Sequence, residues 1–381
     1  MKKLLAIILS VIMLLSLSAC GVGKADWTDD GQISISKSAI EKIIDGEFTK
    51  PKNIILIIGD GMGENDIKAA EIYSEDKFAF GLVLNQIKNQ GYVTTHSADN
   101  EITDSAAAGT ALSTGVKTNN GIIGKDPQGN DLKTMAELAR EYGKKVGIIT
   151  NESIHGATPS TFTVHNDSRD NRKEIVNSFI RFKPDVLMGV DYDDVFLKLN
   201  DDERAIFENE YVVAKNFSGF ETALATDHDA EKPFIGFLEQ YSSIPSYNLA
   251  QCAKTAFDRL KNEKGFFLMI ESAGTDKFGH GNDMKGKIAS VVTLDRTVAA
   301  ALLFMKENPD TLLIITSDHE TGGVKEPTGD EKYISDLLTT DSHTATNVKA
   351  FAVGKGSEYF SGKTVDNTDV AKFLIKAIKG E

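Results

Sequence analysis

The chain has 381 residues, of which 41% are hydrophobic and 26% charged. This composition excludes a disordered chain and allows one large folded domain or two smaller ones. Acidic residues outnumber basic ones by 56 to 42, giving a formal net charge of −14, which argues against a nucleic-acid-binding surface. An anionic substrate would therefore need local positive charge, which bound metal ions supply.

The N-terminus has the pattern of an export signal. Residues 1–19 contain two lysines, an apolar run and small residues, the three regions of a signal peptide. The run is too short and too early to be a permanent membrane span. The sequence Leu-Ser-Ala-Cys that ends at Cys20 also resembles a bacterial lipobox, which implies lipidation of Cys20 and a tether over residues 20–37. We expect an exported, extracytoplasmic protein anchored to the cell membrane as a lipoprotein; a plain secretory signal with an incidental cysteine is the alternative.

Cys252 is the only other cysteine, so the mature chain has no internal disulfide despite its oxidising destination. It lies among apolar residues of a segment that looks helical, which predicts a buried packing thiol. Without the two lysines of the signal, 40 basic residues stand against 56 acidic ones, a net charge of about −16. That charge fits an exported enzyme.

Apolar runs alternate with helical patterns along the rest of the chain. The runs predict buried strands at residues 53–59, 145–150, 185–189, 233–238, 266–271, 311–316 and 348–353. The helical patterns cover residues 133–142, 173–182, 201–208, 249–261, 285–307 and 368–378. This alternation predicts an α/β fold with a doubly wound, mainly parallel central sheet and helices on both faces. We expect a single domain over residues 38–381, with a surface insertion near residues 321–342.

The first predicted strand runs directly into Asp60, which has glycines on both sides. Ligands of doubly wound sheets gather at the carboxyl ends of the strands, and the glycines let the backbone approach an ion closely. A metal-binding carboxylate is one interpretation of Asp60. An ordinary Asp-Gly turn is the other.

Ser105 opens a run of small residues that should be helical, and Asp104 precedes it. A helix N-terminus stabilises an anionic phosphate through its unpaired amides and its dipole, so Ser105 is well placed as a phosphate acceptor. The alternative is that Asp104 or Ser105 merely caps the helix.

Three more predicted strands have Asp and His residues beside them. Asp276 and His280 follow one strand and are four residues apart, so one helical turn would place both on one face, a spacing suited to zinc. Asp318, His319 and His343 lie beside two further strands. Taken singly, each is as easily a surface or core residue, but together with Asp60 they predict a metal centre.

These motifs resemble those of the alkaline phosphatase family, in the same order and at similar separations. The resemblance runs from about Asn53 to Gly354 and includes residues 114–118 and the Asn-Gly pair at 120–121. It implies the doubly wound fold of the family and a centre of two Zn²⁺ and one Mg²⁺. The implied zinc ligands are Asp276, His280 and His343 for one ion, and Asp60, Asp318 and His319 for the other. The implied magnesium ligands are Asp60, Thr158 and Glu271, an all-oxygen set that suits this hard ion.

The same resemblance implies hydrolysis of phosphate monoesters to an alcohol and inorganic phosphate, through a phosphoserine on Ser105. It implies that Arg169 and Lys277 bind the substrate phosphate, Arg169 with a planar fork that suits two oxygens; a solvated surface arginine is the alternative. A homodimer is implied as well, since family members are often dimers. One departure is Gly156, where many relatives carry a histidine or an aspartate, with His155 one position earlier. Its effect on the magnesium site is open.

Other functions are compatible with such a metal centre. Sulfatases need an oxidisable cysteine or serine in a different motif, and cofactor-independent phosphoglycerate mutases are cytoplasmic, whereas this chain has an export signal. A phosphodiesterase would need an apolar site for the second ester group, whereas Arg169 with Lys277 favours a dianionic terminal phosphate. The alternative from another class is a surface lipoprotein that binds phosphate or metal without catalysis.

Overall fold

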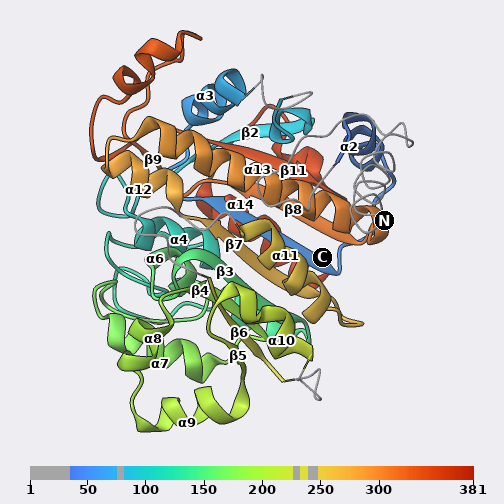
Figure 1. Cartoon of the computed structure of the whole chain (residues 1–381), viewed down its shortest axis with the longest axis vertical. Helices are drawn as coiled ribbons and strands as arrows, with labels where there is room; N and C mark the ends of the chain where they lie inside the picture. Colours follow the sequence, from blue (N-terminus) through green and yellow to red (C-terminus); the bar gives the residue numbers. More distant parts are fainter. Residues whose placement is uncertain (1–34, 75–80, 226–231, 239–247) are drawn as a thin grey trace, which may run out of the picture.

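The computed structural model describes residues 35–74, 81–225, 232–238 and 248–381 (Figure 1). The predicted signal peptide, the lipidation site at Cys20 and most of the tether lie outside these residues. The folded part begins slightly before the predicted boundary at residue 38, because Ile35 is buried in a hydrophobic core and Ser36 caps the helix α2 (Lys37–Ile44). The last three residues of the predicted tether therefore belong to the domain.

A ten-stranded sheet forms the centre of the molecule, in the order β12-β2-β11-β8-β1-β7-β3-β4-β6-β5. Its strands are β1 (Asn53–Gly59), β2 (Asn89–Thr94), β3 (Lys145–Ser153), β4 (Val186–Val190), β5 (Val212–Ala214), β6 (Phe234–Leu238), β7 (Phe266–Ser272), β8 (Thr311–Thr316), β11 (Val348–Val353) and β12 (Thr364–Asp366). Among these described strands only β11 runs against its neighbours, β8 and β2. The predicted mainly parallel sheet is confirmed. A separate antiparallel pair consists of β9 (Glu320–Thr321) and β10 (His343–Thr344).

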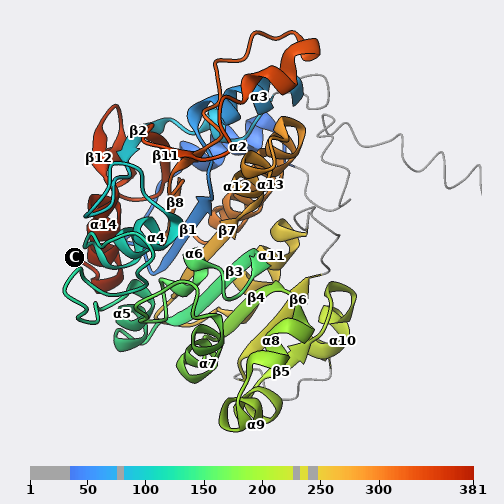
Figure 2. The same cartoon turned by 90° about the vertical axis from the view of Figure 1, so that its left-hand side faces the viewer.

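Helices cover both faces of the sheet, as the two perpendicular views show (Figures 1 and 2). After α2 they are α3 (Glu64–Ser74), α4 (Ser105–Thr114), α5 (Met135–Glu141), α6 (Ala157–Ser160), α7 (Arg172–Phe182), α8 (Tyr192–Lys198), α9 (Asp201–Glu210), α10 (Phe220–Ala225), α11 (Leu249–Arg259), α12 (Gly274–His280), α13 (Met284–Glu307) and α14 (Asn367–Lys379). The 3₁₀ helices are η1 (Leu84–Gln86), η2 (Phe217–Gly219), η3 (Glu331–Leu337) and η4 (Ser357–Phe360). Because side chains of a strand alternate between its faces, Ile55 and Ile57 lie in the core under α11 and α13, and Ile54 and Leu56 in the core under α4, α5 and α14. The doubly wound α/β fold is confirmed.

All seven predicted strands and all six predicted helices are present, with ends displaced by a few residues at most. The sequence patterns do not predict β2, β5 and β12. Two of these strands have three residues each, and β2 has half-buried polar residues in place of an apolar run. Short or partly exposed strands carry too weak a pattern to separate them from loops.

The helix α13 is buried in the core. Of the described helices it alone is long and apolar enough, by length and composition, to cross a membrane, but 72% of its apolar stretch is buried inside the protein. It packs on α11, which carries Cys252. That cysteine is free and buried, and burial raises the pKa of its thiol, so the predicted packing thiol is confirmed.

The residues between β9 and β10 extend away from the central sheet and include the 3₁₀ helix η3. This excursion projects beyond α3 at the top of Figures 1 and 2. Val324, Ile334 and Leu337 form a small apolar cluster with Ala69 of α3 and Met284 of α13. The cluster attaches the excursion to the same face of the sheet as the two helices.

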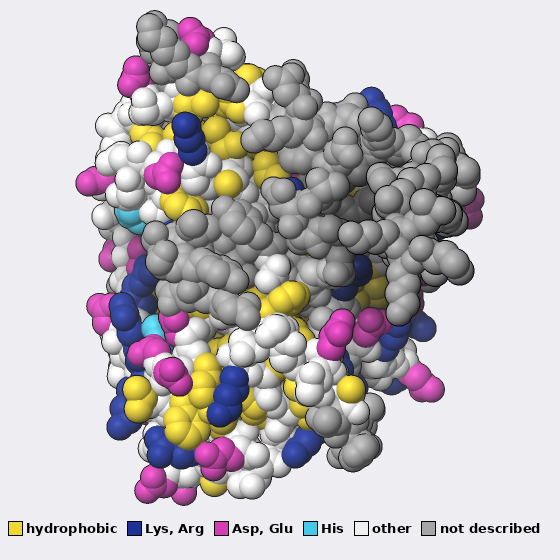
Figure 3. All heavy atoms as spheres, in the orientation of Figure 1, with side chains coloured by type: hydrophobic (Ala, Val, Ile, Leu, Met, Phe, Trp, Pro, Cys, Tyr) yellow, Lys and Arg dark blue, Asp and Glu magenta, His cyan; other side chains and the backbone are white. Residues whose placement is uncertain are grey.

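Acidic and basic side chains lie beside each other over α7, α8 and α9 on the face drawn in Figure 3. Ion pairs of these helices join Arg181 to Glu174 and Glu203, and Lys198 to Asp194. Exposed pairs of this kind contribute little stability each. This part of the surface is mixed in charge.

Candidate metal centre

The carboxyl ends of β1, β7 and β8 meet at one edge of the sheet, because the three strands are parallel neighbours. Asp60 follows β1 directly, Glu271 lies in β7 and Asp318 comes shortly after β8. All three carboxylates are buried. The topology therefore brings Asp60 together with two acidic groups that lie more than 200 residues further along the chain.

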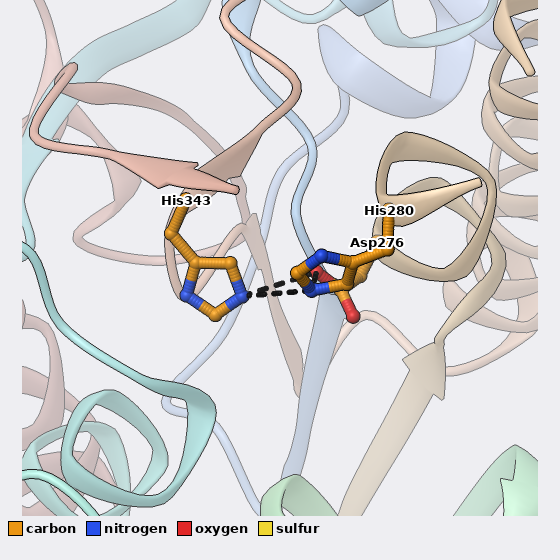
Figure 4. Close-up of side chains that lie close together, drawn as sticks. All are labelled: Asp276, His280 and His343. Carbon is orange, nitrogen blue, oxygen red and sulfur yellow. Dashed lines mark hydrogen bonds and ion pairs between the residues drawn. The ribbon is translucent and has the colours of Figure 1, made fainter. Parts of the chain in front are cut away.

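Asp276, His280 and His343 form the first of three groups of potential metal ligands (Figure 4). Asp276 and His280 lie one turn apart on α12, and His343 comes from β10. Asp276 Oδ1 is 3.2 Å from His280 Nε2 and 3.3 Å from His343 Nε2. The Nδ1 of each ring faces a backbone carbonyl, that of Asp341 at 2.6 Å and that of Thr103 at 2.9 Å. Because a carbonyl only accepts, each Nδ1 carries the proton and each Nε2 keeps a lone pair for a metal ion.

His319 is the centre of the second group, with Asp60 and Asp276. Its Nε2 lies 3.5 Å from Asp60 Oδ1 and 3.3 Å from Asp318 Oδ2, and its ring stacks on that of His343. Asp60 Oδ1 and Asp318 Oδ2 are buried, and no described residue forms a hydrogen bond with them. Buried oxygens seldom lack a partner in folded proteins, and a cation here would provide one.

Asp60 also belongs to a third group, with Glu152 and Glu271. Oε1 of Glu271 and the hydroxyl of Thr158 are likewise buried without a hydrogen-bond partner among the described residues. This group has oxygen ligands alone, as Mg²⁺ prefers. The resemblance seen in the sequence implies Asp60, Thr158 and Glu271 for such a group but not Glu152. The local sequence signal for Glu152 is its position as an acidic residue near the carboxyl end of β3, similar to that of Asp60 at the end of β1.

The electrostatics of the groups favour a bound cation. Burial raises the pKa of Asp60 well above its ordinary value, and repulsion from Asp318 and Asp276 raises it further. Burial and the neighbouring Glu152 raise the pKa of Glu271 to about 8. Carboxylates that repel one another in a buried place are stabilised by positive charge. The mixed nitrogen and oxygen donors of the first two groups fit Zn²⁺, and the oxygen donors of the third fit Mg²⁺.

Ser105 is the first residue of α4, and Asp104 is the N-cap of that helix: Asp104 Oδ1 accepts a hydrogen bond from the amide of Ala107 at 2.9 Å. Because Asp104 is the cap, the hydroxyl of Ser105 is left out of the capping. It is buried, and its Oγ lies 3.2 Å from His319 Nε2. The structure thus places Ser105 at a helix N-terminus beside the second group of ligands.

Arg169 and Lys277 line a cavity of about 650 Å³ next to the ligand groups. Arg169 Nη1 lies 2.9 Å from Asp104 Oδ2, and Lys277 Nζ lies 2.8 Å from Glu152 Oε2. The carboxylate of Glu152 raises the pKa of Lys277 above its ordinary value. A carboxylate therefore orients each of the two cations at the cavity wall.

His155 takes no part in the ligand groups. Its Nε2 lies 2.9 Å from Asp194 Oδ2, on α8, so the ring is paired with that helix. Gly156 lies beside the side chain of Glu152. The space at residue 156 is therefore filled by another part of the same chain.

A doubly wound α/β domain with carboxylate and imidazole groups around a buried serine has the architecture of a metal-dependent hydrolase. A family model described as Alkaline phosphatase matches residues 51–185 and 221–335. The chain belongs to the alkaline phosphatase family, a family of phosphomonoester hydrolases, which confirms the predicted resemblance.

The chain is similar to two proteins of Bacillus subtilis named Alkaline phosphatase 4 and Alkaline phosphatase 3. It is 35% identical to the first over 71% of this chain and 62% of that protein, and 29% identical to the second over 91% and 93%. Among solved structures, alkaline phosphatase from the Antarctic bacterium TAB5 matches with a TM-score of 0.75 and 28% identity, over 87% of this chain and 99% of that one. A mutant of the TAB5 enzyme, described with Mg bound in its M3 site, matches with a TM-score of 0.74 and 27% identity over the same shares.

Proposed function

We propose that this chain hydrolyses phosphate monoesters to an alcohol and inorganic phosphate, through a phosphoserine on Ser105, at a centre of two Zn²⁺ and one Mg²⁺. The observation that carries the proposal is the position of Ser105 Oγ, buried at the N-terminus of α4 and 3.2 Å from His319 Nε2. On one side the hydroxyl has a group of metal ligands. On the other it has the free amides of a helix N-terminus, which bind phosphate.

Three sets of side chains would hold the ions. They are Asp276, His280 and His343 for one zinc ion, Asp60, Asp318 and His319 for the other, and Asp60, Thr158 and Glu271 for magnesium. When bound, these ions neutralise the charge on phosphate oxygens and lower the pKa of a bound hydroxyl or water. Burial lowers the pKa of His319, which keeps its ring neutral and therefore able to act as a ligand.

The chain supplies the nucleophile and positions the phosphate. Ser105 Oγ forms a bond to phosphorus while the bond from phosphorus to the ester oxygen breaks, and the alcohol leaves with a proton. Water then attacks the phosphoserine, inorganic phosphate leaves and Ser105 regains its proton. The amides at the start of α4 and the guanidinium of Arg169 bind the phosphate oxygens in both steps. Asp104 orients Arg169 for this role.

Arg169 and Lys277 support a preference for monoesters over diesters. The terminal phosphate of a monoester is a dianion, and two cations at the wall of one cavity match that charge. A diester carries a single negative charge and a second organic group. The cavity lining contains apolar residues such as Val190 and Phe278 beside charged ones such as Glu152, so the preference rests on the two cations.

The test compares p-nitrophenyl phosphate with bis-p-nitrophenyl phosphate as substrates of purified residues 21–381, before and after chelation. We expect faster turnover of the monoester, loss of activity on chelation, and recovery when zinc and magnesium are added back. Cobalt and manganese belong in the same series, because Asp and His ligands also accept them. Preference for the diester, or activity that survives chelation, would overturn the proposal.

We further propose that the protein is exported, anchored to the cell membrane through Cys20, and assembled as a homodimer. The support is the sequence pattern of residues 1–20 for the first two points and the family resemblance for the third. In fractionated cells the wild type should be found with the membranes, and Cys20→Ser should lose the anchor. Wild-type protein found only in the soluble fraction would count against anchoring. Light scattering of the purified protein tests the dimer.

A further inference from the structure

Gly156 is a glycine for reasons of space. Its backbone has φ −54° and ψ 155°, a conformation open to any residue. A β-carbon at this position would lie 2.9 Å from Cδ of Glu152 and nearer still to its Oε1. The backbone conformation would therefore accept any residue here, and it is a clash with the carboxylate of Glu152 that a larger residue would cause.

The Glu152 side chain reaches from the end of β3 into the third ligand group. One of its oxygens lies within 4.8 Å of ligand oxygens of both Asp60 and Glu271. Its Oε2 pairs with Lys277 Nζ at 2.8 Å, and the side chain is 18% exposed. Glu152 thus lies between a cation at the cavity wall and two fully buried carboxylates.

Three buried oxygens near this place have no hydrogen-bond partner among the described residues. They belong to Asp60, Glu271 and Thr158, which come from the end of β1, from β7 and from α6. A fourth oxygen ligand from Glu152 would bring a third carboxylate to the group. Hard dications take six or more oxygens, and their affinity rises with the number of charged ligands.

We propose that Glu152 is a direct ligand of the magnesium ion, and that Gly156 provides the space through which its carboxylate reaches the ion. The inference rests on the magnesium site of the proposed function and adds a ligand to that site. Three carboxylates and a hydroxyl make the site oxygen-only and strongly acidic, which favours Mg²⁺ over Zn²⁺ there.

The competing interpretation is that Glu152 only orients Lys277. Two substitutions separate the interpretations. Glu152→Gln removes both the ligand charge and the ion pair, whereas Lys277→Gln removes the ion pair and leaves the carboxylate in place. If Glu152 is a ligand, Mg²⁺ binding weakens in the first variant and persists or tightens in the second. If it acts through Lys277, both variants weaken alike.

Gly156→Ala is a third variant, which tests the inference without changing Glu152 itself. The atoms that its methyl group would meet are mainly the far end of the flexible Glu152 side chain, so the domain should still fold while the carboxylate is displaced. Its Mg²⁺ affinity should fall as that of Glu152→Gln does. The double variant should be no weaker than either single one, because both changes remove the same ligand.

The measurement is calorimetric titration of Mg²⁺ into zinc-loaded, magnesium-free protein, with zinc and magnesium per chain determined by elemental analysis. We expect the dissociation constant for Mg²⁺ to rise at least about tenfold in Glu152→Gln and Gly156→Ala. The zinc content of both variants, and their unfolding temperature in the presence of chelator, should equal those of the wild type. Unchanged Mg²⁺ affinity in Glu152→Gln, or an equal loss in Lys277→Gln, would overturn the inference. If Mg²⁺ binding depends on Glu152 but the protein has no turnover, only the proposed function is contradicted. If the protein has turnover but its Mg²⁺ affinity does not depend on Glu152, only this inference is contradicted.

Discussion

Asp104 Oδ2 lies 2.9 Å from Arg169 Nη1, while Asp104 Oδ1 caps the helix that begins with Ser105. One carboxylate therefore connects Ser105, the proposed nucleophile, to Arg169, the proposed phosphate-binding group. Asp104 Oδ2 also accepts a hydrogen bond from the amide of Gly121 at 3.0 Å. With all these partners, Asp104 is held in place firmly enough to orient Arg169.

Replacement of Asp104 by alanine should affect both stability and catalysis. Loss of the N-cap should lower the free energy of unfolding by about 1 kcal/mol, and the freed Arg169 should lower kcat/KM by about 10- to 100-fold. Urea unfolding and steady-state kinetics measure the two effects. Asp99→Ala is the matched control, because Asp99 is an exposed acid of the same loop that accepts from Asn120 and Ser97 instead of Arg169. Equal kinetics in the two variants would contradict the role of Asp104.

Ser105→Ala should abolish turnover while metal and phosphate binding persist. Removal of a nucleophile that acts with its surroundings as a unit reduces kcat by at least about 10³-fold. Acid quenching during hydrolysis of a radiolabelled monoester should leave label on the wild type and none on the variant. Ser113→Ala is the control on the same helix, where the hydroxyl bonds only to the carbonyl of Thr110. Turnover near the wild-type rate in Ser105→Ala would leave a different nucleophile to be found.

Asp276 belongs to both the first and the second ligand group, whereas His280 belongs to the first alone. Asp276→Ala removes a ligand of the first zinc ion and a negative charge close to Asp60 and His319 of the second, so it should weaken both zinc sites, whereas His280→Ala should lower the zinc content by about one ion per chain. Elemental analysis after passage through metal-free buffer distinguishes the two results. The same zinc content in both variants would show that Asp276 does not bridge the groups.

Lys287 and Asp66 form a buried ion pair that is connected to Asp276 of the first ligand group through Thr321. Lys287 Nζ is 3.3 Å from Asp66 Oδ1, and neither side chain has exposed surface. Lys287 also donates to the carbonyl of Thr321, whose side chain donates to Asp276 at 2.7 Å. Lys287→Met would leave a buried carboxylate without its cation, so the free energy of unfolding should fall by about 3–5 kcal/mol.

Chemical unfolding of Lys287→Met checks this expectation. Lys285→Met, on the exposed side of the same helix, should change stability by less than about 0.5 kcal/mol. Addition of Asp66→Asn to Lys287→Met should recover part of the loss, since the uncompensated charge is gone. If the two lysine variants are equally stable, the buried pair contributes nothing.

Asp295 should make stability depend on pH. Its carboxylate accepts from the amides of Val83 and Leu84 at 3.0 and 2.8 Å, yet burial raises its pKa to about 7. In the unfolded chain its pKa is about 3.9. The folded state therefore binds the proton more tightly, and the stability due to this proton is complete below about pH 4 and lost as pH rises through about 7.

The free energy of unfolding of the wild type should accordingly fall relative to Asp295→Asn between about pH 4 and 7, by up to about 4 kcal/mol, and the difference should be level above that range. Urea unfolding at a series of pH values measures the difference. Asp66, whose pKa burial also raises to about 7, is present in both proteins and cancels. A difference that does not change with pH would show that Asp295 titrates at its ordinary value in the folded protein.

The central strands were predictable because each is buried on both faces, so its sequence is a continuous apolar run. β1 and β8 begin and end where the runs do. The direction of β11 was not predictable, since a parallel and an antiparallel strand in the middle of a sheet have the same pattern. β5 and β12 have too few residues for any pattern.

The same distinction applies within the metal centre. Asp60, Asp276 and His280 were predictable because their signals are local: a carboxylate directly after a buried strand, and two ligands one helical turn apart. Glu152 is also an acid near the end of a strand, but what distinguishes it from other acids, the space beside Gly156 that its carboxylate occupies and its ion pair with Lys277, exists only in the folded chain. The sequence left open whether His155, one residue from Gly156, affects the magnesium site, and only the structure shows that its ring pairs with Asp194.

The sequence by itself determined the α/β class, the central strands and the residue types of most candidate ligands, since periodicity and residue type depend on neighbours a few positions away. Only the tertiary structure decided which carboxylate orients which cation: Asp104 with Arg169, Glu152 with Lys277, and Asp66 with Lys287. These pairs join residues far apart in the chain. Their contacts exist only because the order of the strands and the packing of helices on the sheet place them together.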